Sequence, residues 1–491
     1  MQSPTKQRAS PRILTTETPH VPGPVNFDWP LANTAEELLR KRIAEFLEEN
    51  RFARVLAERM RAETGTDFFE WVDHLVLGPA HEEELVEAGF TLDEQAETAA
   101  AQAAYEHPRA TLPRVLHRGN KSGPIVVALK PEFVADFISC HNVTSEPEGE
   151  PCSRYRRVLV AEENGTRLEA VERRAYRGFV PEALAPGELE RIIKARELWR
   201  TRPRIVAPGH ERLLTSSPTE AEAVKAANGI LDRVIDLVGR DLACQFFFET
   251  ERWYWESRNT AGRLQKHRQD TLGLGWGNHD HHTFRCSREH FTDLIEFLLK
   301  LGFVKRERYY AGSEAGWGAQ IMEQPVVGIV VFADVDLMPE ETEIDFSVQK
   351  LPPAPRVSTV GLWVGLHGES FLEAGMHHLE ARFDFDLLRD QLKGAGVNMM
   401  KPFSDFEFLR QAFTEGERWP VRRERAEQLL KAGLITRQQC EQFIKEGALG
   451  SHLENLQRHG GFKGFNQKSV SVVIAATDPR RNHFKSEPVA A

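Results

Sequence analysis

Nine residues near the middle of the chain carry an unusual density of chemically active side chains. The segment Gly277-Asn-His-Asp-His-His-Thr-Phe-Arg285 predicts a β-strand, on which alternate side chains face the same side. One face then carries His279, His281, Thr283 and Arg285, and the other carries Asn278, Asp280, His282 and Phe284. Imidazoles and a guanidinium on one face are suited to binding a metal ion beside an anion.

A second segment, Gly375-Met-His-His-Leu-Glu-Ala-Arg-Phe383, repeats this pattern. It predicts that His378, Glu380 and Arg382 share a face and that His377 lies on the other. Because each segment is followed by a helix, a glycine stop and another strand, the two indicate an internal repeat. One histidine from each strand and one carboxylate would make a two-His-one-carboxylate metal site with open positions.

The alternative interpretation is that these histidines are polar positions on a solvated sheet or hydrogen-bonded core groups. A single cluster would favour that interpretation, whereas the repeat favours a metal. A zinc hydrolase is a less natural interpretation, because the chain contains no HExxH or other short-spaced zinc motif.

The elements around both segments predict an α+β fold with two β-α-β-β-β modules. Residues 276–350 form the first module, with a helix whose apolar face runs from Phe291 to Leu299 and three further strands over 303–310, 317–322 and 326–332. Residues 355–491 form the second module, with a helix over 384–393, a strand over 397–400, a helical insertion at about 416–458 and a final strand over 469–476.

The first half of the chain contains no catalytic motif that we recognise. Residues 1–33, rich in proline, predict a disordered tail, and residues 34–275 predict a mixed, helix-rich α/β region of unknown role. Within it, Asn164-Gly165 between alternating segments predicts a β-hairpin. His74 lies in a strand-like run before a helix and Gly89, so it marks either a core histidine or a further module without metal.

Composition limits the classes of protein. The chain has 491 residues, enough for two to four domains, and 63 Lys plus Arg against 73 Asp plus Glu give a net charge of −10. A nucleic-acid partner is therefore not expected. The five cysteines are scattered, and no run approaches 18 apolar residues, so we expect a cytoplasmic protein without a membrane partner. A homodimer is left open.

The histidine segments resemble a known family. Asp280-His281-x-x-Phe284-Arg285, followed by a helix, Gly302-Phe303 and Tyr309-Tyr310, is similar to the first metal-binding segment of the 2-oxoadipate dioxygenase/decarboxylase (hydroxyglutarate synthase) family. That family belongs to the vicinal oxygen chelate superfamily, which is built of paired β-α-β-β-β modules. His378-Leu379 with Arg382 resembles the second segment, although the family prefers Asn where this chain has His377.

The resemblance implies a set of site residues. His281 and His378 would bind Fe(II), or another divalent metal, and Arg285 would hold a carboxylate of a 2-oxo acid, with Arg382 also at the substrate. The third ligand is expected to be Glu407, within Phe406-Glu407-Phe408, with Glu415 and Glu323 as rivals.

The activity that the resemblance implies is oxidative decarboxylation of a 2-oxo acid by O2, as in the conversion of 2-oxoadipate to 2-hydroxyglutarate and CO2. Two alternatives remain open. One is another metal-dependent enzyme of the superfamily, an isomerase, a lyase or an extradiol dioxygenase, and the other is a metal-free protein that binds a small molecule. The likeness covers at most residues 276–476, so the substrate's identity does not follow from it.

Overall fold

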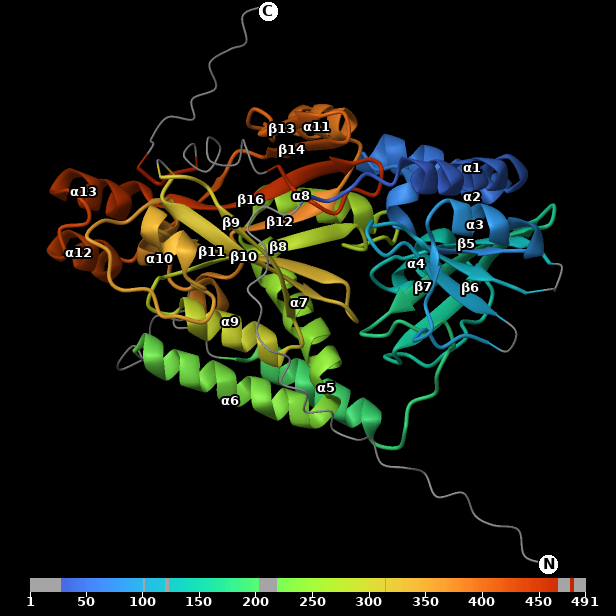
Figure 1. Cartoon of the computed structure of the whole chain (residues 1–491), viewed down its shortest axis with the longest axis horizontal. Helices are drawn as coiled ribbons and strands as arrows, with labels where there is room; N and C mark the ends of the chain where they lie inside the picture. Colours follow the sequence, from blue (N-terminus) through green and yellow to red (C-terminus); the bar gives the residue numbers. More distant parts are fainter. Residues whose placement is uncertain are drawn as a thin grey trace, which may run out of the picture.

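The computed structural model describes residues 28–99, 102–119, 123–202, 219–313, 315–466 and 477–480. Two β-sheets lie side by side in this part of the chain, with helices packed around them (Figure 1). The first 27 residues of the predicted tail lie outside it. None of the described helices is long and apolar enough to cross a membrane.

The larger sheet contains the first predicted module. Its first strand β8 pairs in parallel with its last strand β11, and β10 joins both β11 and β9 in antiparallel fashion. A helix follows the first strand, as the apolar pattern over 291–299 predicts. The elements are β8 (His279–Cys286), α9 (Phe291–Lys300), β9 (Val304–Tyr310), β10 (Trp317–Gln324) and β11 (Ile329–Asp336).

The second module repeats this topology. Its first strand β12 pairs in parallel with β16, which continues antiparallel to β14 and then to β13. The first strands of both modules, β8 and β12, are antiparallel neighbours at the centre of the sheet. The predicted α+β fold of paired β-α-β-β-β modules is therefore confirmed. The elements are β12 (His378–Arg382), α11 (Phe385–Gly394), β13 (Ser404–Phe406), β14 (Leu409–Phe413) and β16 (Ala448–Arg458).

Two predicted elements of this second module are wrong. The helical insertion contains α12 (Arg423–Lys431) and α13 (Arg437–Glu446) but does not extend to 458, because Gly447, at φ 70°, ends α13 and β16 begins at once. Residues 397–400 form only one isolated bridge, from Met399 to Thr414, and the strand begins at Ser404. The strand predicted over 469–476 lies outside the described residues.

The smaller sheet contains a second pair of modules. Its order is β2-β3-β4-β1-β5-β7-β6, and β1–β4 and β5–β7 are the parallel pairs, as β8–β11 and β12–β16 are in the larger sheet. Its central first strands, β1 and β5, are likewise antiparallel. The further module that His74 suggests is therefore present, and a fourth follows it.

The strands and helices of this N-terminal pair, with the two helices that precede it, have the following bounds: α1 (Asn33–Glu49), α2 (Arg51–Arg59), β1 (Val72–Leu77), α3 (Glu82–Glu87), β2 (Thr91–Leu92), β3 (Ala103–Glu106), β4 (Arg114–His117), β5 (Ile125–Leu129), α4 (Val134–His141), β6 (Tyr155–Glu163) and β7 (Thr166–Arg173). The fourth module lacks one strand, which is reduced to a bridge between Glu148 and Arg157. The predicted hairpin is confirmed, with Asn164 and Gly165 at positive φ between β6 and β7.

The inner face of this N-terminal sheet, the face opposite its helices, is filled rather than open. Phe179 packs there with Val76, Leu116 and Val126 in one buried apolar cluster. His74 faces Phe179, with ring centroids 4.9 Å apart, and its Nδ1 lies 2.8 Å from Asp73 Oδ2. Apolar side chains thus fill the inner face of the N-terminal pair, and His74 is a core histidine with a carboxylate partner.

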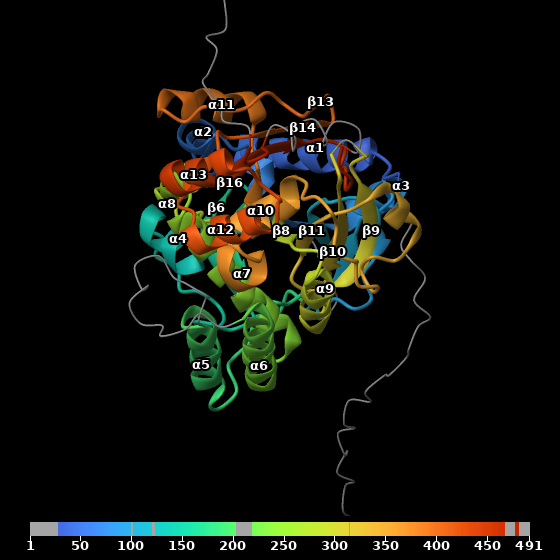
Figure 2. The ribbon, with the colours of Figure 1, turned by 90° about the vertical axis from the view of Figure 1, so that its left-hand side faces the viewer.

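Helices between the two pairs cover one face of the larger sheet. The apolar core joins α5, α6, α7 and α9 to Phe284 and Cys286 of β8 and to Leu379 of β12. In Figure 2, α5 and α6 lie below this sheet and α11 lies on the opposite side of the molecule. The remaining elements are α5 (Glu188–Arg200), α6 (Glu220–Val238), α7 (Arg240–Ser257), α8 (Thr260–Asp270), α10 (Thr359–His367), β15 (Glu417–Trp419) and the short helices η1 (Met60–Thr64), η2 (Phe68–Trp71), η3 (Pro79–His81), η4 (Pro339–Glu343) and η5 (Ser370–Ala374).

Candidate metal centre

The two predicted histidine ligands converge at the centre of the larger sheet. In the β8–β12 register, His378 is opposite Thr283 and Glu380 is opposite His281. Since alternate residues share a face, His281 and His378 both project from the inner face, away from the helices. Their ring centroids lie 5.9 Å apart. The internal repeat therefore brings one imidazole from each module to a common point.

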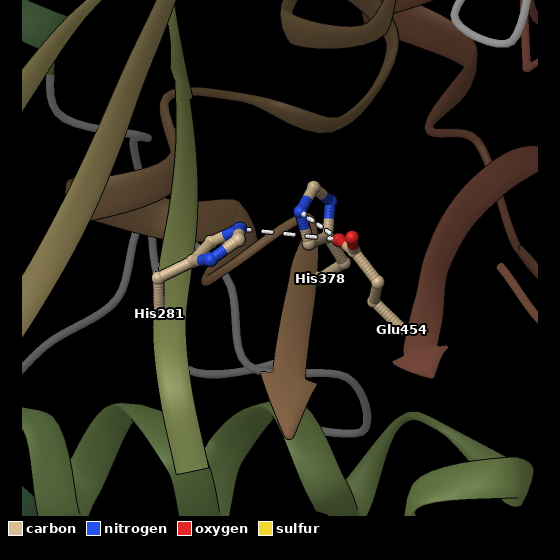
Figure 3. Close-up of side chains that lie close together, drawn as sticks. All are labelled: His281, His378 and Glu454. Carbon is tan, nitrogen blue, oxygen red and sulfur yellow. Dashed lines mark ion pairs between the residues drawn. The ribbon is translucent and has the colours of Figure 1, made fainter. Parts of the chain in front are cut away.

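The carboxylate at this point is Glu454 of β16. Its Oε2 lies 3.1 Å from His378 Nε2 and 3.9 Å from His281 Nε2 (Figure 3). Ligand atoms bound 2.0–2.2 Å from one metal ion lie about 3.0–3.6 Å apart, so these three atoms are close to a coordination geometry. All three side chains are buried. Two imidazoles and one carboxylate form the donor set of the facial triad, which leaves further positions open.

The predicted third ligand, Glu407, does not reach this cluster. It lies exposed in the turn between β13 and β14. The two alternative third ligands are also unsuitable, because Glu415 is exposed and Glu323 forms an ion pair with Lys463. The sequence-based prediction did not include Glu454, because it assigned residues 448–458 to the helical insertion.

A signal for the carboxylate that lies beside the two histidines was present in the sequence. His452-Leu453-Glu454 repeats His378-Leu379-Glu380, and the two triplets are paired residue for residue in the parallel register of β12 and β16. A third copy of the histidine–carboxylate pattern after a glycine would have indicated a further strand of the same sheet.

A second carboxylate orients the first histidine. Glu380 Oε1 lies 2.6 Å from His281 Nδ1, on the side of the ring away from Glu454. Gln411 Nε2 donates to Glu380 Oε2 at 2.9 Å and to Glu454 Oε1 at 3.0 Å. A carboxylate on the remote nitrogen of a metal-binding histidine fixes its tautomer and raises its basicity. Glu380 and Gln411 therefore hold both His281 and Glu454 in place.

The electrostatics of the cluster favour a bound cation. Burial raises the pKa of Glu454 well above its ordinary value, and the neighbouring carboxylate of Glu380 raises it further. Burial and the charge of His281 hold the pKa of His378 well below its ordinary value, which favours the neutral imidazole that a metal ion requires; its Nε2 lies 2.8 Å from Thr283 Oγ1. A divalent ion would relieve the repulsion between the two carboxylates.

A largely aromatic cavity opens above the three ligands. Thr283, Asp334 and Gln411 supply its other polar groups, and no lysine or arginine is among the described residues that line it. A flat or apolar ligand group would be well accommodated there, next to the metal's open positions. The aromatic residues of the wall are Tyr309, Trp317, Phe332, Phe403, Phe413 and Phe465.

The predicted anion clamp Arg285 lies just behind this wall. Its side chain is 1% exposed, and its Nε is 4.0 Å from Asp334 Oδ2. Its Nε and Nη1 have no hydrogen-bond partner among the described residues. Burial raises the pKa of Asp334 to about 7, against the opposing charge of Arg285. Arg382 lies elsewhere, with its Nη2 donating to the Glu70 carbonyl at 3.2 Å.

Comparisons with known proteins give only distant likenesses. No protein-family model and no curated protein matches the chain. Among solved structures, a mutant of 4-hydroxymandelate synthase from Streptomyces coelicolor is 12% identical, covers 84% of this chain and 99% of its own, and has a TM-score of 0.26. Methylmalonyl-CoA epimerase from Mycobacterium tuberculosis is 14% identical, covers 37% of this chain and 88% of its own, and has a TM-score of 0.21.

A third similar structure is the uncharacterised protein YdcJ of Shigella flexneri, which includes domain DUF1338. It is 13% identical, covers 49% of this chain and 73% of its own, and has a TM-score of 0.22. TM-scores of this size do not establish a shared fold. The fold assignment therefore rests on the strand order and register of the four modules, which are those of the vicinal oxygen chelate type.

Proposed function

We propose that the protein is a metal-dependent enzyme of the vicinal oxygen chelate type, and specifically an Fe(II)-dependent dioxygenase that decarboxylates a 2-oxo acid. The observation that carries the proposal is the convergence of His281, His378 and Glu454 on one point beneath an aromatic cavity. Two histidines and one carboxylate are typical of non-haem Fe(II) oxygenases, because the set leaves positions for both a bidentate substrate and O2.

Ferrous iron held by these three side chains would supply the electron transfer that lets O2 react with a 2-oxo acid. Other side chains of the protein position these three. Glu380 holds the imidazole of His281 in orientation, and Gln411 holds both carboxylates. The aromatic wall limits the entry of water, which strengthens electrostatic contacts inside the cavity.

The substrate class follows from the far side of the cavity. Arg285 has two guanidinium nitrogens without a hydrogen-bond partner in the described part of the chain, and it lies behind the wall residue Asp334. A 2-oxo acid with a second carboxylate would reach Arg285 when Asp334 is protonated, which its raised pKa of about 7 permits near neutral pH. A substrate such as 2-oxoadipate fits this arrangement, with the oxo acid end at the metal and the distal carboxylate at Arg285.

The test begins with metal content, measured by elemental mass spectrometry on protein purified without oxygen. We expect about one iron per chain, and expect it to be lost in His281→Ala, His378→Ala and Glu454→Gln. Glu407→Gln is the matched control, because Glu407 is an exposed glutamate in the same module, and it should retain the metal.

O2 uptake with a series of 2-oxo acids then tests the reaction. Uptake that depends on a 2-oxo acid, with release of CO2, supports the proposal. Bound metal without O2 uptake would transfer the assignment to an isomerase or lyase of the same superfamily. Metal retained in all three ligand variants would refute the site itself.

A further inference from the structure

A second enclosed pocket lies where the two pairs of modules meet. Its wall combines Lys130, which follows β5 of the N-terminal pair, with Arg252 of α7 and His279 of β8. Figure 1 shows α7 and β8 in the C-terminal half and β5 in the neighbouring half. This pocket shares no lining residue with the aromatic cavity above the metal ligands.

Cations dominate the wall of this pocket. Four arginine or lysine side chains line it, together with two glutamates. Both glutamates already face a cation outside the pocket wall: Glu249 pairs with Arg196 at 2.8 Å, and Glu132 pairs with Lys266 at 3.6 Å. The wall therefore has little negative charge left for its own cations.

Two of the four cations are also engaged outside the pocket. Arg173 pairs with Asp73 at 2.8 Å, and Arg174 pairs with Glu172. The remaining two, Lys130 and Arg252, have no carboxylate within 4.0 Å among the described residues. They are the groups that a ligand would neutralise.

Arg252 is built into the wall rather than free at the surface. It is 3% exposed, its Nη1 lies 3.4 Å from His282 Nε2, and its Nε has no hydrogen-bond partner among the residues that the structure describes. An unsatisfied guanidinium nitrogen in a buried position is costly. Burial also lowers the pKa of Lys130 to about 8; the charge of Asp73 opposes this effect, and the charges of Arg173, Arg382 and Arg252 add to it. Lys130 and Arg252 line the same pocket, and an anion bound in it would neutralise both cations.

We propose that this pocket binds a small oxyanion, an inorganic phosphate or the carboxylate of a small acid, through Lys130 and Arg252. Such an anion would connect the N-terminal pair of modules to the helices that cover the larger sheet, because Lys130 follows β5 and Arg252 lies on α7. The pocket's volume of ≈ 40 Å³ admits a small anion and excludes a nucleotide. Binding of this anion would not depend on the metal centre. It would give the N-terminal pair of modules a part in ligand binding.

The experiment uses the full-length protein after treatment with a chelator, so that the outcome does not depend on the metal. Thermal unfolding is followed in a buffer free of oxyanions while inorganic phosphate or succinate is titrated in. We expect a saturable rise in Tm of about 3 °C at a hundredfold excess over Kd with at least one of the two probes. A response to phosphate alone identifies an oxyanion of the phosphate type, and a response to succinate alone identifies a carboxylate.

Lys130→Met and Arg252→Met should each weaken the response at least tenfold. Lys300→Met is the control, because Lys300 pairs with Asp232 on the surface, remote from the pocket wall. In the absence of anions, Lys130→Met should raise Tm, since it removes an unpaired buried cation. The proposal is overturned if neither probe shifts Tm saturably, or if both pocket variants keep the wild-type response.

Discussion

Asp334 provides a quantitative test of the cavity's electrostatics. This residue of β11 is 3% exposed, lines the cavity and lies 4.0 Å from Arg285. Burial raises its pKa from 3.8 to about 7, although the charges of Arg285 and His281 oppose the effect. We expect Asp334→Asn to stabilise the metal-free protein at neutral and alkaline pH.

The sign follows from the direction of the shift. The folded-state pKa lies above the unfolded value, so the folded state binds the proton more tightly. This contribution to stability is fully present below pH 3.8 and is lost as the pH rises to about 7. Above pH 7 the ionised carboxylate costs about 4 kcal/mol at most, at 1.36 kcal/mol per pKa unit. Asparagine does not titrate and avoids that cost.

Scanning calorimetry of the chelator-treated wild type and Asp334→Asn from pH 5 to pH 8 measures the effect. For a chain of this length, about 1 kcal/mol corresponds to about 1 °C in Tm. The Tm of the variant relative to wild type should therefore increase by about 3 °C between pH 5 and pH 8. Asp236→Asn, at an exposed position of α6, should show no such trend. A difference that is constant with pH, or that falls, would refute the reasoning.

Three further predictions follow from the structure. Glu380→Gln removes the carboxylate that orients His281, and metal affinity, measured by competition with a chelator, should fall about 10- to 100-fold; unchanged affinity would contradict this. Phe179→Ala empties the inner face of the N-terminal sheet and should cost about 3–5 kcal/mol of unfolding free energy, with the iron content unchanged. Arg285→Met should raise the KM for 2-oxo acids that have a distal carboxylate while the iron content stays at the wild-type level, and equal KM values would remove Arg285 from the substrate site.

Much of the metal centre could be predicted because it depends on local periodicity. Histidines at alternate positions, followed by an amphipathic helix and a glycine, identify a strand and its face without any tertiary information. The pairing of His281 with His378 follows from the repeat, because equivalent strands of two related modules meet at the centre of one sheet. The hairpin at Asn164-Gly165 was predictable for a similarly local reason, the positive φ of its turn.

The carboxylate that lies beside the two histidines was not predictable in the same way. Glu454 is 76 residues after His378 in the chain. The insertion between them contains two helices, and the helical pattern was extended past the point where β16 begins. Glu407 and Glu454 are both glutamates near apolar residues, and only the repeat of the triplet His-Leu-Glu separates Glu454 from Glu407 in the sequence. The distinction is made by strand register, which places Glu454 beside Glu380.

The sequence by itself determined the module type, the two histidines and the helices and strands that follow them, because these depend on spacing within about 30 residues. Only the tertiary structure decided which carboxylate lies beside the two histidines, that Asp334 separates Arg285 from the cavity and that the N-terminal half contains a second pair of modules whose inner face is filled by apolar side chains. Those features depend on contacts between residues more than 40 positions apart. Such contacts are selected by packing and burial over the whole fold, and local periodicity carries no information about them.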